Sequence, residues 1–233
     1  MLGSASSGKK RLPRLAGIAA ALLLAAGVAC ADEPLPPIWQ MVEKRPPGAL
    51  PGEPVLGKAD APLTIIEYAS LTCPHCARFA TQTLPKLKQE WIDTGKAKLV
   101  FRDFPLDGLA LRAAALTHCV PPERYLEFVD TLFKEQPSWI VLGDKAIARI
   151  ASLGGLSEAQ AEACLADTKR VESISAARAA AEKEWGVDAT PTFFIDGMKI
   201  SGAYPYVDLE SKDRDFKSAL ATALAQKQPS DAH

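Results

Sequence analysis

Two cysteines stand three positions apart in SLTCPHCARF, residues 70–79, with Pro74 and His75 between them. If a helix begins here, Cys73 lies at its first turn, and Pro74 pre-sets the backbone φ angle that a helix start requires. Unsatisfied backbone N–H groups and the positive end of the helix dipole both stabilise a thiolate at that position. A neighbouring histidine adds to this effect, so the pattern predicts a Cys73 thiol of low pKa.

A cysteine pair of this kind can carry out thiol–disulfide exchange. Stabilising the Cys73 thiolate stabilises the reduced pair, so the Cys73–Cys76 disulfide becomes an oxidant that passes its bond to another protein. We expect Cys73 to form a mixed disulfide as the nucleophile, and the more buried Cys76 to resolve it. The alternative of a purely structural disulfide is disfavoured because such a small ring is easily strained. A zinc site would need two further ligands, and a second C-x-x-C or H-x-x-H is missing from the sequence.

The segments around the pair predict a βαβ unit. Residues 63–70, LTIIEYAS, are β-branched and aromatic, which indicates a buried strand that runs directly into the cysteines. Helical spacing follows as far as Gly95, with a kink or interruption expected at Pro85, and residues 96–105 predict a second strand. The chain then becomes Ala-rich over about 106–185, where helices are predicted near 108–119, 122–135, 143–153, 157–166 and 168–185.

The C-terminal part returns to strands. Thr192 to Ile195 and Met198 to Ser201 are predicted to pair as a hairpin through Asp196-Gly197, because Asp-Gly suits a two-residue turn. A closing helix is expected over about 206–226, followed by a polar tail, residues 227–233.

The first 31 residues have the pattern of a secretory signal peptide. Four basic residues at positions 9–14 precede the uncharged run LAGIAAALLLAAGVAC, which is short and Ala-rich for a membrane-spanning helix. Ala29-Cys30-Ala31 fits an A-x-A cleavage site. The alternatives are a lipid anchor at Cys30 and an uncleaved N-terminal anchor. All three predict that the rest of the chain is exported, and a periplasmic location is expected.

Residues 32–54 form a Pro-rich arm. Repeated proline forbids a helix and favours an extended lead-in, so the globular domain is expected from Val55 to about residue 226. Trp39 offers one way to pin the arm to that domain. The roughly 200 residues that remain without the signal are enough for one domain with its own core.

The net charge does not point to a nucleic-acid partner. Of the 27 basic residues, 23 remain once the signal is removed, against 28 acidic residues, for a net charge of −5. This mild excess of acidic residues is spread along the chain, and it gives no argument for nucleic-acid binding.

These features together resemble the DsbA-like branch of the thioredoxin superfamily. The likeness rests on Cys-Pro-His-Cys after TIIEYAS, on a helical block inserted into a thioredoxin frame, and on the Thr-Pro of TPTFF about 115 residues after the motif. It covers about residues 55–226. The expected fold class is therefore α/β, a thioredoxin-like fold with a helical domain inserted after the first βαβ unit.

The resemblance also implies roles for single residues. Pro191 is implied as a cis-proline that faces the cysteines, which lets the backbone of Thr190 pair with an extended substrate segment. Glu67 is implied as a carboxyl beneath the active site that assists proton transfer from the buried cysteine. The alternatives are an ordinary proline at a strand start and a strand-end glutamate that reaches solvent.

The activity that the resemblance implies is that of an exported protein disulfide oxidoreductase. Its redox-active disulfide, Cys73–Cys76, would need no cofactor or metal. Its partners would be folding exported proteins with cysteines and a membrane protein that reoxidises it, and a monomer is expected. Threonine before the cis-proline and an extra cysteine pair leave a disulfide isomerase or reductase as the alternative. A periplasmic metallochaperone is disfavoured because the chain has only three methionines and three histidines.

The extra pair, Cys119 and Cys164, lies in the predicted helical block. Leftover cysteines usually pair in an oxidising compartment, so a structural disulfide between them is predicted. Two buried free thiols are the alternative. Next to Cys119, His118 is expected to be a solvated side chain at a helix end rather than a metal ligand.

Overall fold

The computed structural model describes residues 37–207 and 214–227. The predicted signal peptide, the lipidation and cleavage sites at Cys30, and nearly all of the polar tail lie outside the described residues. Within these two ranges, no helix combines the length and the apolar character needed to cross a membrane.

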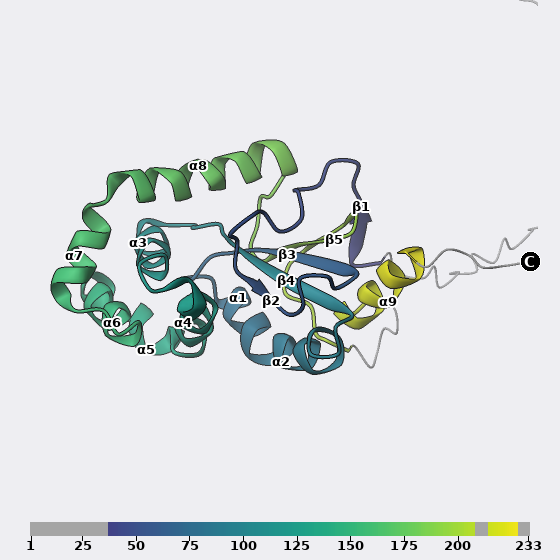
Figure 1. Cartoon of the computed structure of the whole chain (residues 1–233), viewed down its shortest axis with the longest axis horizontal. Coiled ribbons are helices and arrows are strands. Elements are labelled where there is room, and N and C mark those ends of the chain that lie inside the picture. Colours follow the sequence, from purple (N-terminus) through teal and green to yellow (C-terminus); the bar gives the residue numbers. More distant parts are fainter. Residues whose placement is uncertain (1–36, 208–213, 228–233) are drawn as a thin grey trace, which may run out of the picture. The chain divides into compact units, whose positions relative to one another are not determined.

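A mixed β-sheet is the frame of the described region, with the strand order β1-β6-β5-β3-β4-β2 (Figure 1). Its strands are β1 (Trp39–Met41), β2 (Val55–Leu56), β3 (Leu63–Ala69), β4 (Ala97–Asp103), β5 (Thr192–Ile195) and β6 (Met198–Ser201). Strands β3 and β4 are parallel, and the other neighbours are antiparallel. The central strand β3 is buried on both faces, which explains its almost unbroken apolar run.

The sheet begins earlier in the chain than the sequence predicted. Trp39 of β1 lies opposite Ile200 of β6, and Ile38 beside it is buried. Of the two roles considered for the arm, a lead-in and a segment pinned through Trp39, the described part has the second, and the sheet extends before Val55. Proline prevents helix formation, but the proline-free segment 38–41 can still pair as an edge strand and bury its apolar side chains.

The rest of the arm is held by one arginine. Arg102 of β4 forms an ion pair with Glu53 at 2.7 Å, and it donates further hydrogen bonds to the carbonyls of Pro47 and Gly48. The part of the arm after β1 thus contacts β4 through Arg102, and it turns at Pro51–Gly52 before β2 begins.

The helix that follows the cysteine motif alternates between α and π turns. Its segments are α1 (Pro74–Arg78), the π-turn η1 (Phe79–Thr83), α2 (Leu84–Leu87) and the π-turn η2 (Lys88–Ile92). Pro85 has no N–H to donate, and the turn before it is wound so that Leu84 N donates to Phe79 O, five residues back. The interruption predicted at Pro85 takes this form.

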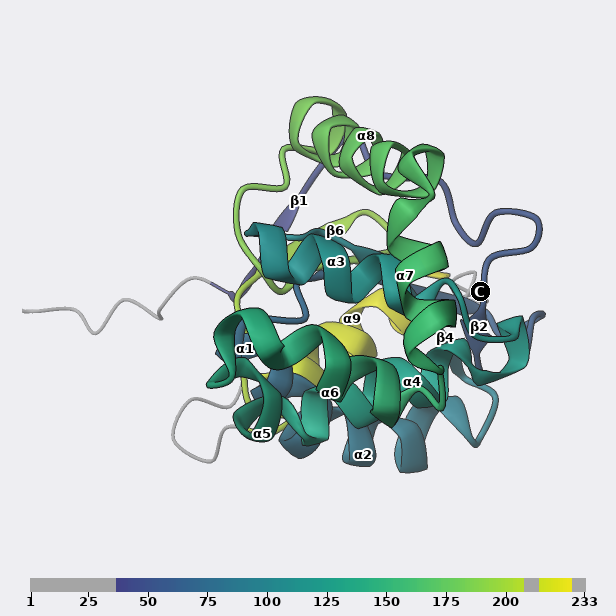
Figure 2. The same cartoon turned by 90° about the vertical axis from the view of Figure 1, so that its left-hand side faces the viewer.

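In the sequence, a block of helices lies between strands β4 and β5 of the sheet. Figure 2 shows this block from the side that faces away from the sheet's far end, with its helices toward the viewer. The helices are α3 (Gly108–Thr117), α4 (Pro122–Lys134), α5 (Gln136–Ile140), the 3-10 turn η3 (Gly143–Lys145), α6 (Ala146–Leu153), α7 (Glu158–Ala166) and α8 (Thr168–Trp185). Their bounds agree with the predicted ones within a few residues, except that α5 was not predicted as a separate helix. Asp107, Ser157 and Asp167 cap α3, α7 and α8 through their side chains.

The two faces of the sheet are covered by different helices (Figure 1). On one face, Phe79 of η1, Phe193 of β5 and Phe216 of α9 (Phe216–Lys227) pack with ring centroids 4.5 to 5.5 Å apart. On the other face, Ala181 of α8 packs with a buried cluster that includes Phe194 of β5. The order of βαβ unit, helical block and hairpin follows the expected order along the chain.

The closing helix starts later than predicted. Tyr206 lies outside it because its hydroxyl accepts a hydrogen bond from Trp91 Nε1 and donates one to Glu90. Asp215 then caps the helix by accepting a hydrogen bond from Ser218 N at 2.7 Å, so the helix begins at 216.

Candidate active site

The Cys-Pro-His-Cys motif lies where β3 gives way to α1. Cys73 is the N-cap residue of α1, with an extended backbone, and Pro74 occupies the first turn of the helix. Cys73 N donates to Ser70 O, and Cys73 O accepts from Ala77 N, so the turn leads directly into the helix. Both thiols are free and buried, with Cys73 5% and Cys76 0% exposed.

The surroundings separate the pKa values of the two thiols. A hydrogen bond from Cys76 is the main cause that lowers the pKa of Cys73 to about 5; desolvation opposes it, and Thr190 and the backbone N–H groups of Cys76 and His75 assist it. Burial raises the pKa of Cys76 well above its ordinary range, and the charges of Glu67 and Cys73 add to this rise. At neutral pH, Cys73 is therefore a thiolate and Cys76 is a thiol.

The contribution of His75 differs from the one expected from the sequence. Its side chain is exposed, and its effect on Cys73 comes from its backbone N–H rather than from the imidazole ring. The position at the helix N-terminus thus accounts for this part of the stabilisation.

The Thr190–Pro191 segment lies against the motif from the far end of the chain. The Thr190–Pro191 peptide bond is cis, and Thr190 O lies 3.4 Å from Cys73 Sγ. The register of the sheet explains this meeting, because Thr192 at the start of β5 lies opposite Tyr68 near the end of β3. Thr190 is buried, and apart from the effect of its side chain on Cys73, its Oγ1 has no hydrogen-bond partner.

Glu67 lies on β3 and is 3% exposed, with no hydrogen-bond partner for its Oε1. Burial raises the pKa of this carboxyl to about 8, and the negative charge of Cys73 adds to the rise. The alternative of a strand-end glutamate that reaches solvent does not fit this burial. A carboxyl that is neutral just below pH 8 can both give and take a proton under physiological conditions.

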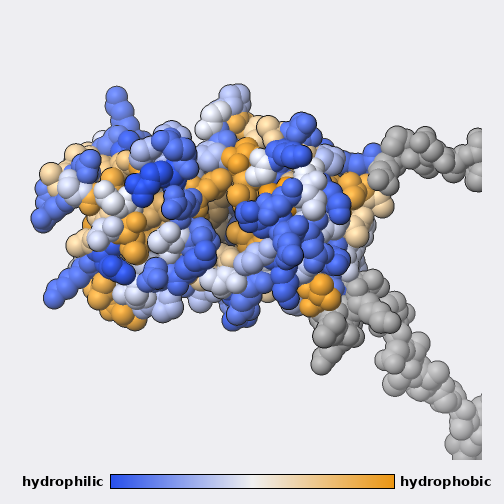
Figure 3. Space-filling view, turned by 60° about the horizontal axis from the view of Figure 1, so that its bottom comes forward, coloured by the Kyte–Doolittle hydropathy of each residue, from blue (hydrophilic) through white to orange (hydrophobic). Residues whose placement is uncertain are grey.

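Behind Glu67 there is an opening between two helices. The carboxyl lines a cavity of about 460 Å³ between α2 and α4, whose other walls include Leu84, Leu126 and Phe133. Figure 3 shows a hollow with an apolar floor on the face that carries these helices. Lys88, Glu127, Asp130 and Lys134 also line it, and they supply its polar part.

Two side chains of the helical block hold the turn before Cys73. Thr72 Oγ1 donates to Asp107 Oδ2 at 2.7 Å. Gln136 Nε2 donates to Leu71 O at 2.7 Å and to Cys73 O at 3.1 Å. Sequence reasoning missed both contacts. Asp107 could have been noticed as the cap of the helix predicted near 108, but no local signal pointed to Gln136.

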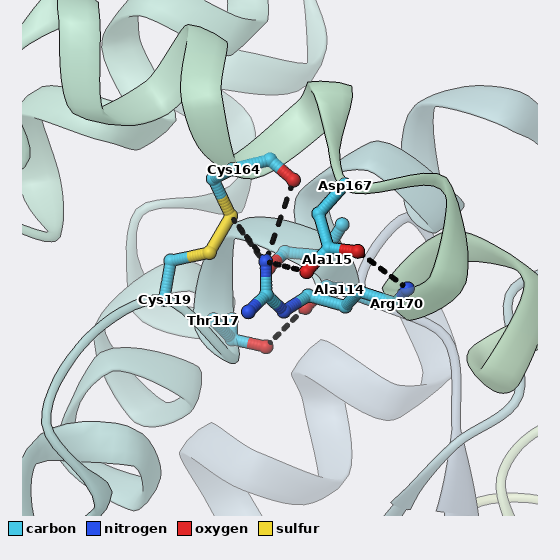
Figure 4. Close-up of a disulfide and its surroundings, with 7 residues drawn as sticks. All are labelled: Ala114, Ala115, Thr117, Cys119, Cys164, Asp167 and Arg170. Atoms are coloured by element: carbon cyan, nitrogen blue, oxygen red, sulfur yellow. Dashed lines mark hydrogen bonds and ion pairs between the residues drawn. A yellow bond between two sulfur atoms is a disulfide. The ribbon is translucent and has the colours of Figure 1, made fainter.

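The second cysteine pair forms a disulfide that joins the residues after α3 to α7. Cys119 and Cys164 are bonded, with their Cα atoms 6.2 Å apart (Figure 4). Arg170 Nη1 lies 3.7 Å from Cys164 Sγ and also forms an ion pair with Asp167 at 3.2 Å. The bond ties together helices of the block and does not involve Cys73 or Cys76.

The side chain of His118 contacts the carboxylate of Asp103 as well as solvent. Its Nε2 lies 2.7 Å from Asp103 Oδ2, and its side chain is 39% exposed. Tyr125 OH donates to the same carboxylate oxygen at 3.3 Å. Among the residues that the structure describes, no group of three or more histidine, cysteine, aspartate or glutamate side chains is arranged to hold a metal ion.

Known proteins share this sequence pattern. The sequence model of the family described as Thioredoxin matches residues 49–212. A Rickettsia bellii protein provisionally named a protein-disulfide oxidoreductase is 34% identical over 148 residues, which make up 62% of this chain and 57% of that protein. Disulfide bond formation protein D of Bacillus subtilis is 27% identical over 183 residues, 72% of this chain and 79% of that protein. The match thus spans little more than half the length of the Rickettsia relative.

Solved structures share the fold. Alpha-DsbA1 of Wolbachia pipientis is 34% identical, with a TM-score of 0.63 over 77% of this chain and 94% of that one. Oxidised BdbD of Bacillus subtilis is 25% identical, with a TM-score of 0.61 over 79% and 98% of the two chains. The predicted fold class, a thioredoxin-like fold with inserted helices, is confirmed. The chain belongs to the thioredoxin family, as one of its DsbA-like members.

Proposed function

We propose that this protein is an exported thiol–disulfide oxidoreductase that introduces disulfide bonds into folding proteins. The observation that carries the proposal is the difference between the pKa values of the two thiols: that of Cys73 is lowered to about 5, and that of Cys76 is raised. A stable Cys73 thiolate favours the reduced pair, which makes the Cys73–Cys76 disulfide an oxidant. The name of the Bacillus subtilis relative, disulfide bond formation protein D, supports the same reaction.

The proposed cycle starts from the Cys73–Cys76 disulfide. A substrate thiolate attacks Cys73 Sγ, a mixed disulfide forms, and Cys76 leaves as a thiolate. A second substrate thiolate then attacks the substrate sulfur of the mixed disulfide, and Cys73 leaves as a thiolate. The low pKa of Cys73 makes it a good leaving group in this step. Two electrons pass from the substrate to the cysteine pair, and a membrane partner is proposed to remove them.

Glu67 is the proposed proton donor to Cys76. Because burial raises the pKa of Cys76, the departing thiolate must take up a proton. The carboxyl of Glu67 has a pKa of about 8, so it is mostly protonated at neutral pH, and in its ionised form it is near enough to raise the pKa of Cys76. When the pair is reoxidised, the same carboxylate can take the proton back.

Thr190 and Pro191 are proposed to receive the substrate as an extended segment. A Cys73 thiol can donate to Thr190 O at 3.4 Å, but neither the thiolate nor the disulfide can. In the oxidised protein, which receives the substrate, this carbonyl is therefore free to accept a hydrogen bond from a substrate N–H, in the manner of strand addition. Backbone pairing of this kind suits many different clients, because it does not depend on the identity of the client's side chains.

A redox equilibrium with glutathione tests the proposal. The purified protein without its signal peptide is equilibrated with mixtures of reduced and oxidised glutathione, with Cys73→Ser as the inactive control. We expect an equilibrium far toward the reduced pair, as for a strong oxidant, and rapid oxidation of a reduced, unfolded client. A potential near that of a reducing thioredoxin would reject the oxidase and favour the isomerase or reductase, which the threonine before Pro191 leaves as the second candidate.

Export and location have their own test. The signal pattern of residues 1–31 supports a periplasmic protein cleaved before Asp32. N-terminal sequencing of protein from the periplasmic fraction should begin at Asp32. A mature protein that begins at Cys30 and carries lipid would instead establish the membrane-anchored alternative.

A further inference from the structure

A buried amide of the helical block reaches the turn that carries Cys73. Gln136 is the first residue of α5 and is 6% exposed. Its Nε2 atom donates to Leu71 O at 2.7 Å and to Cys73 O at 3.1 Å. An amide nitrogen has two hydrogens, and here both are directed at the carbonyl groups on either side of Thr72.

Two side chains, Asp107 and Gln136, form hydrogen bonds with the turn, but they bind different parts of it. Asp107 binds the side chain of Thr72, whose hydroxyl also lies 3.1 Å from Ser70 Oγ. Gln136 binds the main chain, including the carbonyl of Cys73 itself. The orientation of the Cys73 backbone, and with it the direction of the side chain, therefore depends more directly on Gln136.

We propose that Gln136 is a positioning residue: it holds the Cys73 sulfur at the N-terminus of α1, where the helix stabilises the thiolate, and so couples the helical block to the redox balance of the cysteine pair. This inference rests on the proposed function, because it concerns the same reaction. Gln136 touches neither the sulfur atoms nor the substrate, and it acts through the backbone of the turn.

The physical argument starts from what the thiolate needs. The backbone N–H groups of His75 and Cys76 stabilise the Cys73 sulfur only while Cys73 keeps its N-cap geometry. Loss of both hydrogen bonds from Gln136 would leave two carbonyls of a buried turn to find other donors, and the turn would shift to do so. A shift of the sulfur away from α1 makes the thiolate less stable and the disulfide a weaker oxidant.

Charge gives a second, independent prediction. The amide of Gln136 presents its positive end to the turn. A glutamate in its place has the same shape, but its carboxylate would face two carbonyl oxygens and a thiolate. Gln136→Glu should therefore weaken the oxidant more than Gln136→Met, which only removes the donors.

A control variant is available in the same helix. Trp139 of α5 is fully buried, and its Nε1 donates to Leu132 O at 2.9 Å, within the helical block. Trp139→Phe thus removes a buried hydrogen bond of α5 that is not made to the turn. It is expected to cost stability, as Gln136→Met does, but it leaves both hydrogen bonds from Gln136 to the turn in place.

The experiment measures three quantities for each protein: the pKa of Cys73 from thiolate absorbance, the equilibrium constant with glutathione, and the melting temperature. We expect Gln136→Met to shift the equilibrium constant about five-fold toward the disulfide, the effect of one net hydrogen bond. Gln136→Glu should shift it further, and Trp139→Phe should lower only the melting temperature. If Gln136→Met does not fold, Gln136→Glu, which keeps the size and polarity of the side chain, is compared with Trp139→Phe in its place.

The outcomes separate the two proposals. If Gln136→Met and Trp139→Phe both lose stability while the pKa of Cys73 and the equilibrium constant stay at the wild-type values, Gln136 is only structural and the inference is overturned. If the wild-type protein itself is not an oxidant in glutathione, the proposed function fails instead.

Discussion

The sulfur of Cys73 lies 3.4 Å from the carbonyl oxygen of Thr190, although 117 residues separate the two in the sequence. The whole helical block, α3 to α8, is inserted between them. The contact exists because β5 returns beside β3 after that block, so that Thr192 and Tyr68 lie opposite each other. Cys73 and the backbone of Thr190 are therefore brought together by the sheet, and neither half of the frame makes the site alone.

Thr190→Val should weaken the Cys73 thiolate. The Thr190 side chain helps to lower the pKa of Cys73, and its buried Oγ1 has no other hydrogen-bond partner. Removing the hydroxyl should raise the pKa of Cys73 and lower the melting temperature of the reduced protein at neutral pH, where Cys73 is a thiolate. The oxidised protein has no thiolate at Cys73, so its melting temperature should not fall. Thiolate titration and thermal unfolding of both redox forms check this, and an unchanged pKa of Cys73 would contradict a contribution from the hydroxyl.

Alkylation should distinguish the two active-site cysteines. In the reduced protein at neutral pH, iodoacetamide should react at Cys73 and leave Cys76 unmodified, because Cys76 is fully buried and its pKa is raised. The rate should fall as the pH is lowered through about 5, the pKa of Cys73. Peptide mass spectrometry identifies the modified residue. Cys76→Ala removes the main cause of the low pKa, so in this variant the fall should occur at a higher pH.

Glu67→Gln should slow the redox cycle. The variant keeps the shape of the side chain but cannot give a proton to Cys76. Since proton transfer by a positioned side chain contributes roughly a hundred-fold or more, we expect a ten-fold or larger loss in the rate of client oxidation at neutral pH. Stopped-flow measurement of mixed-disulfide formation checks this. An unchanged rate would show that solvent supplies the proton without Glu67.

The same substitution should stabilise the oxidised protein at high pH. The pKa of Glu67 is raised from 4.5 to about 8 in the folded protein, so its contribution to stability is complete below 4.5 and is lost as the pH rises through about 8. Part of this rise comes from the charge of Cys73 and is absent in the disulfide form. Glu67→Gln and the wild type should unfold alike at about pH 4, and the variant should be more stable at about pH 8. Equal unfolding at both pH values would contradict the buried carboxyl.

Local signals in the sequence were sufficient for the elements next to the cysteines. Strands β5 and β6 have the predicted bounds because Asp196 and Gly197, which take positive φ values of 45° and 100°, define a tight hairpin turn on their own. The buried strand β3 was predicted for a similar reason, since its apolar run is continuous. Cys73 could be placed at a helix start because Pro74 marks that start.

What the sequence could not predict depends on contacts between distant segments. The pairing of Trp39 with Ile200 spans most of the chain, and nothing in the arm itself favours a strand over a linker. The role of Gln136 depends on the packing of α5 against the turn, and a glutamine at the start of a short helix has no signal of its own. The start of α9 was predicted too early because the hydrogen bonds that hold Tyr206 elsewhere come from Trp91 and Glu90.

Removal of the second disulfide should cost stability but not redox activity. The bond between Cys119 and Cys164 closes a loop with a sequence separation of 45. A loop of this length corresponds to roughly 4 kcal/mol of stabilisation on the entropic model. The double variant Cys119→Ser/Cys164→Ser should lose about this free energy of unfolding, measured in urea, and keep its glutathione equilibrium within about two-fold. An unchanged free energy of unfolding would favour the alternative of two free thiols in the native protein.

The stability of the reduced protein should rise with pH relative to a variant without the Cys73 thiol. The pKa of Cys73 is about 5 in the folded protein, against about 8.5 for an unfolded cysteine. A lowered pKa contributes stability that is complete above the unfolded value and is lost as the pH falls through the folded value. The free energy of unfolding of the reduced wild type, minus that of reduced Cys73→Ser, should therefore increase between about pH 5 and pH 8.5.

Urea unfolding of both reduced proteins at about pH 4.5, 6, 7.5 and 9 measures this difference. The difference should be constant below about pH 5 and should level off above about pH 8.5. A difference that does not depend on pH would mean that Cys73 titrates as it does in an unfolded chain. The reduced pair would then have no special stability, and the Cys73–Cys76 disulfide would have no reason to pass its bond to another protein.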